Sequence, residues 1–194
     1  MSNRLVLALF AAAFALAQEA DGPGFLRPTN ESVVAVGPLV VVARTAGTGE
    51  MRLDGKPLES KQPAPNVITA TVKLASGRHD LTLSTGGAEY KAQIFVKAKS
   101  GGAEAPEGWA EFRQHPPAAT CETCHGIKAG AWAFKSAALS ESCFGCHDAK
   151  PFPVSHSHNS ETLAECQLCH SPHGSTVKSH LKMKKEVACK VCHA

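Results

Sequence analysis

The sequence predicts two parts that fold in different ways: a small all-β sandwich, then a mostly irregular domain with short helices. Residues 25–98 contain short apolar runs with strand-like alternation and no cysteine, whereas all 8 cysteines lie in residues 121–192. We expect a signal peptide, a flexible lead-in, the sandwich, a linker and the C-terminal domain at residues 1–17, 18–24, 25–98, 99–107 and 108–194.

The first 17 residues have the pattern of a secretory signal peptide. Arg4 opens a short basic region, residues 5–17 are apolar, and Ala15-Leu16-Ala17 forms a small-residue cleavage site. The apolar stretch is shorter than the roughly 20 residues that a membrane span needs, and no later segment reaches that length. We therefore expect an exported protein, periplasmic or at the cell surface, that is not an integral membrane protein.

Strand signals recur through residues 25–98. The runs at 33–36 and 39–43 are apolar, and in 67–74 apolar residues alternate with Thr and Lys, the period of a half-buried strand. Turn signals between strands are Asp54-Gly55, Ser76-Gly77 and Gly86-Gly87. About six short strands with turns at this spacing predict a small antiparallel sandwich.

This strand pattern resembles the Ig-like modules of bacterial exported proteins. It contains no catalytic constellation, and the isolated His79 is expected to be structural or solvated. Two roles stay open for the module. It is either a docking or assembly surface, or a spacer that holds the next domain away from another surface.

One five-residue pattern, Cys-x-x-Cys-His, occurs four times and uses every cysteine. Its cysteines are Cys121 and Cys124, Cys143 and Cys146, Cys166 and Cys169, and Cys189 and Cys192. The histidines that follow are His125, His147, His170 and His193. This pattern is the attachment signature of c-type haem, in which two thiols bind one porphyrin and the adjoining imidazole is the proximal iron ligand. Four copies predict four covalently attached haem c groups.

Cys-x-x-Cys pairs also build zinc sites and short-range disulfides. Neither alternative requires a histidine directly after every second cysteine. Covalent haem is attached outside the cytoplasmic membrane, in agreement with the export signal. We therefore favour haem.

The four motifs form an internal repeat. Their first cysteines stand at positions 121, 143, 166 and 189, so the unit recurs every 22 or 23 residues. Each unit is too short and too poor in apolar side chains to bury a core alone. We expect the porphyrins to be the core and the apo-segment to be unfolded. Trp109 and Phe112, just before the repeat, pack either on a porphyrin or between the domains.

The second axial ligand of each iron distinguishes an electron carrier from a catalyst. Beyond the proximal histidines, the candidates are His115, His156, His158, His173 and His180. Five histidines for four positions predict bis-histidine haems, which have no open site and suit electron transfer. His170 and His173 are three residues apart on one side of the chain, so they should bind two different irons. Met183 is a less favoured axial candidate.

The stretch Cys166-Gln-Leu-Cys169-His170-Ser-Pro-His173-Gly-Ser resembles the multihaem cytochromes with doubled CxxCH motifs, which are related in style to the cytochrome c3-like proteins. The resemblance covers residues 108–194. It implies that His173 binds the iron of a neighbouring haem. It also implies that His158 and His115, which precede Cys166 and Cys121, are distal ligands.

The formal charge of the polypeptide is +3. Each ferric haem contributes about −1, so four haems bring the total to roughly −1. No basic face is clustered in the sequence, and we expect no nucleic-acid partner.

Together these features predict an exported tetrahaem c-type cytochrome, not an enzyme, that relays single electrons to redox partner proteins or other cytochromes. Two alternatives stay open. One is a haem reductase with an open iron site, and the other is a polymeric filament formed by self-association of the chain.

Overall fold

The computed structural model describes residues 22–115, 120–136, 139–147, 165–191 and 193. The predicted signal peptide, His156, His158 and Cys192 lie outside these ranges. No helix within them is long and apolar enough to cross a membrane.

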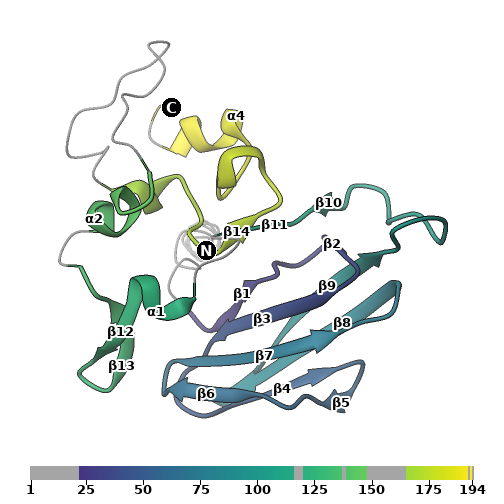
Figure 1. Ribbon diagram of the computed structural model, residues 1–194, viewed down its shortest axis with the longest axis horizontal. Helices are drawn as coiled ribbons and strands as arrows, with labels where there is room; N and C mark the ends of the chain where they lie inside the picture. The colour runs from purple at the N-terminus through teal and green to yellow at the C-terminus, as the bar shows by residue number, and fades with distance from the viewer. Residues whose placement is uncertain (1–21, 116–119, 137–138, 148–164, 192, 194) are drawn as a thin grey trace, which may run out of the picture.

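Two sheets packed face to face form the N-terminal part (Figure 1). The first has the order β1-β3-β7-β6, with bounds Gly24–Arg27, Pro38–Arg44, Val67–Lys73 and Lys61–Ala64. The second has the order β10-β2-β9-β8-β4-β5, with bounds Ala110–Glu111, Ser32–Ala35, Ala88–Lys97, Gly77–Thr85, Gly49–Leu53 and Lys56–Pro57. These two sheets are the sandwich that the strand pattern predicted.

The second sheet is mixed rather than purely antiparallel. Strand β2 runs parallel to both β9 and β10, whereas the remaining pairs of the sandwich are antiparallel. After β2 the chain crosses to the other sheet, and it returns beside β2 only with β9 and β10. Residue periodicity indicates which face of a strand is buried, but not the direction of its partner.

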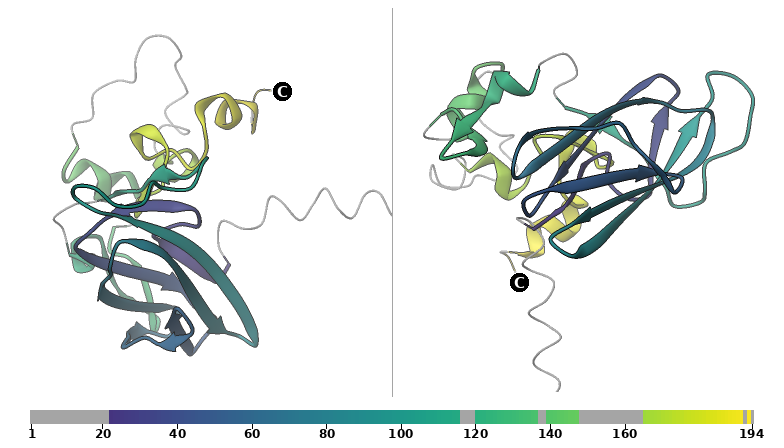
Figure 2. Two further views of the ribbon diagram at one scale, coloured as in Figure 1. Left: turned by 90° about the vertical axis from the view of Figure 1, so that its right-hand side faces the viewer. Right: turned by 90° about the horizontal axis from the view of Figure 1, so that it is seen from below.

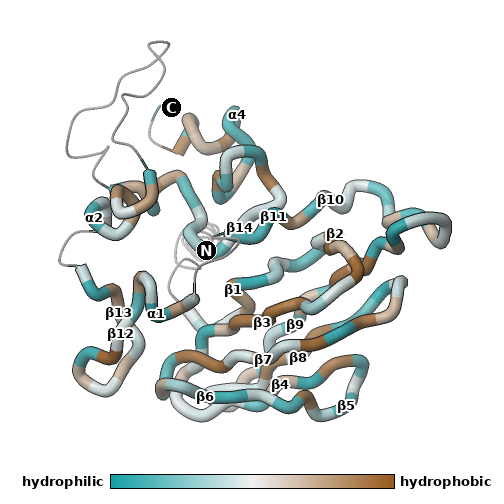
Figure 3. The backbone as a smooth tube through the Cα atoms, in the orientation of Figure 1, coloured by the Kyte–Doolittle hydropathy of each residue, from teal (hydrophilic) through white to brown (hydrophobic). Residues whose placement is uncertain are grey.

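The core of the sandwich consists of apolar side chains that alternate inward from both sheets. The predicted alternation of residues 67–74 is confirmed, because Ile68, Ala70, Val72 and Leu74 are all buried. From the opposite sheet, Leu81, Leu83 and Ile94 have no exposed surface. Figure 3 shows that apolar segments follow these strands, most clearly β3.

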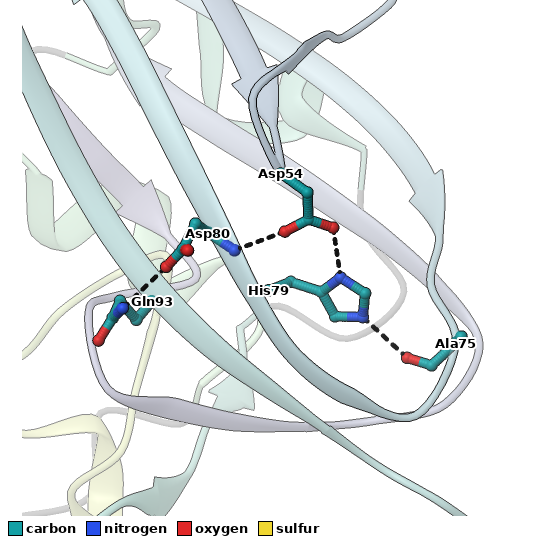
Figure 4. Close-up of polar contacts among 5 residues, drawn as sticks. All are labelled: Asp54, Ala75, His79, Asp80 and Gln93. Atoms are coloured by element: carbon teal, nitrogen blue, oxygen red, sulfur yellow. Dashed lines mark hydrogen bonds and ion pairs between the residues drawn. The ribbon is translucent and has the colours of Figure 1, made fainter.

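His79 has a structural role, as expected. Its Nδ1 lies 2.8 Å from the Asp54 carboxylate and its Nε2 lies 3.0 Å from the Ala75 carbonyl oxygen, while the Asp80 N–H donates to the other Asp54 oxygen at 2.9 Å (Figure 4). Asp54 has a φ of +50° at the turn between β4 and β5. The imidazole therefore ties this turn to the start of β8.

The C-terminal part is built from short elements that lie along one side of the sandwich (Figures 1 and 2). Its strands are β11, β12, β13 and β14, at Arg113–Gln114, His125–Lys128, Ala131–Phe134 and Gly174–Ser175. Its helical turns are α1, α2, η1, η2, α4 and η3, at Cys121–Cys124, Leu139–Phe144, Cys166–Leu168, Lys178–His180, Lys185–Ala188 and Cys189–Val191. The fold is thus a β-sandwich followed by an irregular domain with short helices, as predicted.

The segment between the two parts is joined to the sandwich. Strand β10 adds to the edge of the second sheet, and the Phe112 N–H donates to the Val33 carbonyl oxygen at 2.8 Å. The Phe112 ring belongs to the sandwich core, and the Arg78 guanidinium lies 5.1 Å from the centre of the Trp109 ring. Phe112 therefore packs between the sandwich core and Gly174 of β14, which is one of the two roles that the sequence left open, whereas Trp109 packs on the sandwich.

Candidate functional site

The same backbone turn occurs in all four Cys-x-x-Cys-His motifs. In each motif the histidine N–H donates to the carbonyl oxygen of the first cysteine; for His147, His170 and His193 the distances are 3.0, 2.9 and 2.9 Å. One helical turn places positions i, i+3 and i+4 on the same face. The two cysteines and the histidine of a motif can therefore reach one porphyrin together, which is the chemistry that the spacing predicted.

The β11–β14 pair brings two of the distal candidates together. Arg113 lies opposite Ser175 and Gln114 lies opposite Gly174, in antiparallel register. His115 directly follows Gln114, and His173 directly precedes Gly174, so both lie at the same end of this ladder. Two distal candidates thus start from nearby backbone positions.

Each of these imidazoles lies opposite the histidine of a motif. The ring centres of His173 and His125 are 5.9 Å apart with an angle of 9° between the ring planes, and those of His115 and His147 are 5.9 Å apart with an angle of 19°. Near-parallel rings at this distance are within the range of ordinary aromatic pairs. An imidazole nitrogen binds a transition-metal ion at about 2.0–2.1 Å, so two rings on opposite sides of one ion are about 6 Å apart. The spacing of the two pairs is therefore also compatible with two histidines on one iron.

Backbone carbonyl groups orient two of the imidazoles. The Nδ1 of His115 lies 2.9 Å from the Pro172 carbonyl oxygen, and the Nδ1 of His170 lies 2.8 Å from that of Ser179. A carbonyl oxygen can only accept, so Nδ1 carries the proton and donates it. The Nε2 atoms then carry the lone pairs, which is the arrangement of an iron ligand with its outer hydrogen bond in place.

The environment keeps the central imidazoles neutral. Burial, followed by the charges of His125, Arg27, Arg44 and His115, lowers the pKa of His173 to about 4. Burial also lowers the pKa of His125, although the nearby Ala133 backbone opposes the shift. Only a neutral imidazole has a lone pair for a metal ion. Both residues are therefore in the ligand form at neutral pH.

The seven described cysteines are not paired as disulfides. Burial raises the pKa of Cys143 to about 11, with further contributions from Cys166 and Cys124. Thiols from the first three motifs therefore lie near one another in the domain.

Two polar atoms near the His125 imidazole are buried without a hydrogen-bond partner. They are Trp132 Nε1 and, on strand β1, Arg27 Nε. The Trp132 ring meets the His125 ring edge-on at 6.1 Å, and Cys121 lies close enough to Arg27 to affect its pKa. Buried donors of this kind require acceptors, and haem carries two propionate carboxylates. The donors here therefore fit the group that the motif predicts.

The hairpin that follows the first motif is bound to the sandwich. The Asn66 side chain accepts from the Trp132 N–H at 2.9 Å and donates to the Trp132 carbonyl oxygen at 3.2 Å. Asn66 follows β6 and Trp132 lies on β13, so this pair of hydrogen bonds fixes the first motif against the sandwich. Neither Asn66 nor Arg27 carried a signal in the sequence, since each becomes significant only through a partner far along the chain.

Two further predicted ligands, His180 and His193, also fall within the described residues. His180 lies 5.0 Å from His115, with their rings tilted by 55°, and its Nδ1 is buried without a partner. His193 is exposed at the last motif. Within the described ranges, no group of three or more His, Cys, Asp or Glu side chains converges on a possible metal position. All five distal candidates, His115, His156, His158, His173 and His180, stay predictions.

Comparison with known proteins supports the chemistry of the C-terminal domain. A family model described as the doubled CXXCH motif matches residues 158–194. The doubled motif in that segment indicates covalent attachment of haem c and supports a multihaem c-type cytochrome. No curated protein matches the chain significantly.

Solved structures with some similarity include fibronectin(III)-like modules of CbhA from Clostridium thermocellum, at 18% identity and a TM-score of 0.33, covering 41% of this chain and 100% of that one. The titin M3 domain has 16% identity and a TM-score of 0.29, with coverages of 40% and 97%. A polysaccharide lyase has 18% identity and a TM-score of 0.32, covering 37% of this chain, which spans only 11% of the lyase.

Proposed function

We propose that the chain is an exported tetrahaem c-type cytochrome that relays single electrons between redox partner proteins, with a histidine on each side of every iron. The observation that carries the proposal is the pairing of motif histidines with histidines from other segments. His125 with His173 and His147 with His115 are each 5.9 Å apart.

The residues divide the task of holding each cofactor. Two cysteines of a motif attach the porphyrin, and the histidine of the same motif supplies the proximal imidazole. A second neutral imidazole would bind the iron from the other side and would exclude water or substrate from it. When bound, haem supplies a ferric/ferrous couple that takes up and releases one electron. Residues that close both axial positions therefore suit a carrier rather than an enzyme.

The β11–β14 ladder supports transfer between neighbouring sites. His115 and His173 adjoin the same end of it, and their rings lie opposite the histidines of two different motifs. This arrangement supports adjacent first and second haem sites. Bis-histidine ligation also favours lower reduction potentials than histidine–methionine ligation.

The proposal is tested on protein produced with its signal peptide in a host that attaches c-type haem. We expect an N-terminus at Gln18, a mass with four haem additions, and electron paramagnetic resonance spectra of low-spin ferric haem alone. His173→Ala and His115→Ala should each convert one haem to the high-spin form, while His79→Ala in the sandwich should convert none.

Four results would contradict parts of the proposal. A mass with fewer haems contradicts the tetrahaem assignment, and a high-spin signal in the wild type contradicts closed coordination and favours the reductase alternative. A large assembly in size-exclusion chromatography favours the filament alternative. An N-terminus at Met1 in the recovered protein contradicts export.

A further inference from the structure

We propose that the sandwich is part of the haem site, and that its core residue Phe112 and the adjoining Gly174 are positioning residues for the distal ligand His173. The inference rests on the proposed function. It gives the sandwich a role beyond that of a spacer, since the position of one axial ligand depends on its core.

The first step is the anchoring of Phe112. Its ring is 8% exposed and belongs to the buried cluster that includes Leu39, Val41 and Leu81. Its N–H donates to Val33, and the preceding strand β10 is paired with β2. The position of Phe112 is therefore set by the sandwich.

The second step is the contact of Phe112 with Gly174. A Cβ atom at Gly174 would lie 2.7 Å from Cζ of Phe112, 3.0 Å from its Cε1, and 2.5 Å from the carbonyl oxygen of Arg113. Gly174 also has a φ of +120°, which other residues rarely adopt. Only glycine allows β14 to approach the aromatic ring and β11 this closely.

The third step leads from Gly174 to the ligand. His173 directly precedes Gly174, and its ring centre lies 5.9 Å from that of His125. On the other side of Gly174, the buried Ser175 hydroxyl accepts from the Val177 N–H at 2.9 Å, which holds the following turn. The backbone of His173 is thus held between the sandwich core and this turn. A shift of β14 away from Phe112 would carry the imidazole with it.

The test uses the full-length holoprotein and a matched pair of glycine variants. Gly174→Ala should retain four haems by mass but convert one of them to the high-spin form, and added imidazole should restore the low-spin spectrum by filling the vacated position. Gly108→Ala is the control, because Gly108 also has a positive φ of +82° but no atom lies within 4 Å of the position that a methyl group would take there. It should leave all haems low-spin.

A second pair tests the aromatic contact and remains informative if Gly174→Ala yields no holoprotein. Phe112→Leu should shift the potential of one haem and produce some high-spin signal. Phe95→Leu removes the same side-chain volume from another buried position, which is 5% exposed. It should change neither the potential nor the spin state of any haem. Unchanged spectra in both Gly174→Ala and Phe112→Leu, or equal changes in the variants and their controls, would overturn the inference. A wild type that lacks four low-spin haems would instead contradict the proposed function.

Discussion

The sandwich and the C-terminal domain differ in what fills their interior. Every buried hydrophobic residue of the described chain lies between Val33 and Phe112, and every large exposed hydrophobic residue lies between Ile127 and Val191. The sandwich buries its own apolar side chains, whereas Leu168 and Val191 of the C-terminal domain are 62% and 69% exposed. A polypeptide that leaves such residues uncovered requires another apolar body, and four porphyrins would supply it.

The comparison also shows where the two parts depend on each other. The sandwich is complete as a folding unit, yet Asn66 and Phe112 extend its contacts to the first motif and to β14. We therefore expect the sandwich to be the more stable part, and the C-terminal domain to depend on it.

The largest expected effect is the response to haem. A chain produced without residues 1–17 should not be exported and should therefore receive no haem. Its sandwich should stay folded. The described part of residues 120–193 should lose its protection from hydrogen exchange, because its core is missing. Hydrogen exchange measured by mass spectrometry should show slow exchange in β7, β8 and β9 in both forms. The described part of residues 120–193 should exchange slowly only in the holoprotein. Slow exchange of this part in the haem-free chain would show that it has a polypeptide core of its own.

The next effect is the loss of a core side chain. Ile94→Ala removes a side chain with no exposed surface and should lower the free energy of unfolding of the sandwich by about 2–5 kcal/mol. Val191→Ala in the haem-free chain should change it by less than about 0.5 kcal/mol, since that side chain is already in solvent. Urea denaturation followed by circular dichroism measures both. Equal losses would show that Val191 belongs to a polypeptide core.

A smaller effect is expected at the contact between the two parts. Asn66→Ala removes both side-chain hydrogen bonds to Trp132 and should weaken the docking of the β12–β13 hairpin by about 1–3 kcal/mol. Faster hydrogen exchange in the hairpin of the holoprotein would report this change. Gln62→Ala is the control, because Gln62 bonds only within the sandwich, to Gly47, Gly49 and Pro65, and should leave the hairpin unchanged.

The smallest effect is a pH dependence of the sandwich. Burial acts to lower the pKa of His79, but its hydrogen bonds to Asp54 and Ala75 outweigh burial and raise that pKa above 6.5. Burial acts to raise the pKa of Asp54, but the bonds from His79 and Asp80 outweigh it and lower that pKa below 3.8. The stabilisation is thus complete between pH 3.8 and 6.5.

This stabilisation should be lost above that window, as the pH rises through the raised pKa of His79, and below it, as the pH falls through the lowered pKa of Asp54. Because Asp54 is exposed to solvent, which screens the pair, we expect a change of at most about 1 kcal/mol. Thermal unfolding measured across pH should show it, and His79→Gln should remove the dependence above pH 6.5. If the pH dependence of stability persists in His79→Gln, another titratable group causes it.

Local patterns predicted the strands well. The alternation of residues 67–74 and the Asp54-Gly55 turn appear in the structure, because both depend on neighbours within a few residues. The parallel pairing of β2 with β9 could not be predicted, since it joins residues about sixty positions apart. The sequence also marked His115 and His173 as candidate distal ligands, but not that one short ladder brings their backbones together.

What the sequence by itself determined is the chemistry: the number of attachment motifs, the backbone turn within each, and the histidines that can serve as ligands. These follow from spacings of three or four residues, because residues at those spacings lie on the same face of a helical turn. What only the tertiary structure decided is which histidines meet, and that the core of the sandwich supports one of them through Phe112 and Gly174. Such contacts depend on the path of the whole chain, because residues far apart in sequence become neighbours only when the intervening elements have packed.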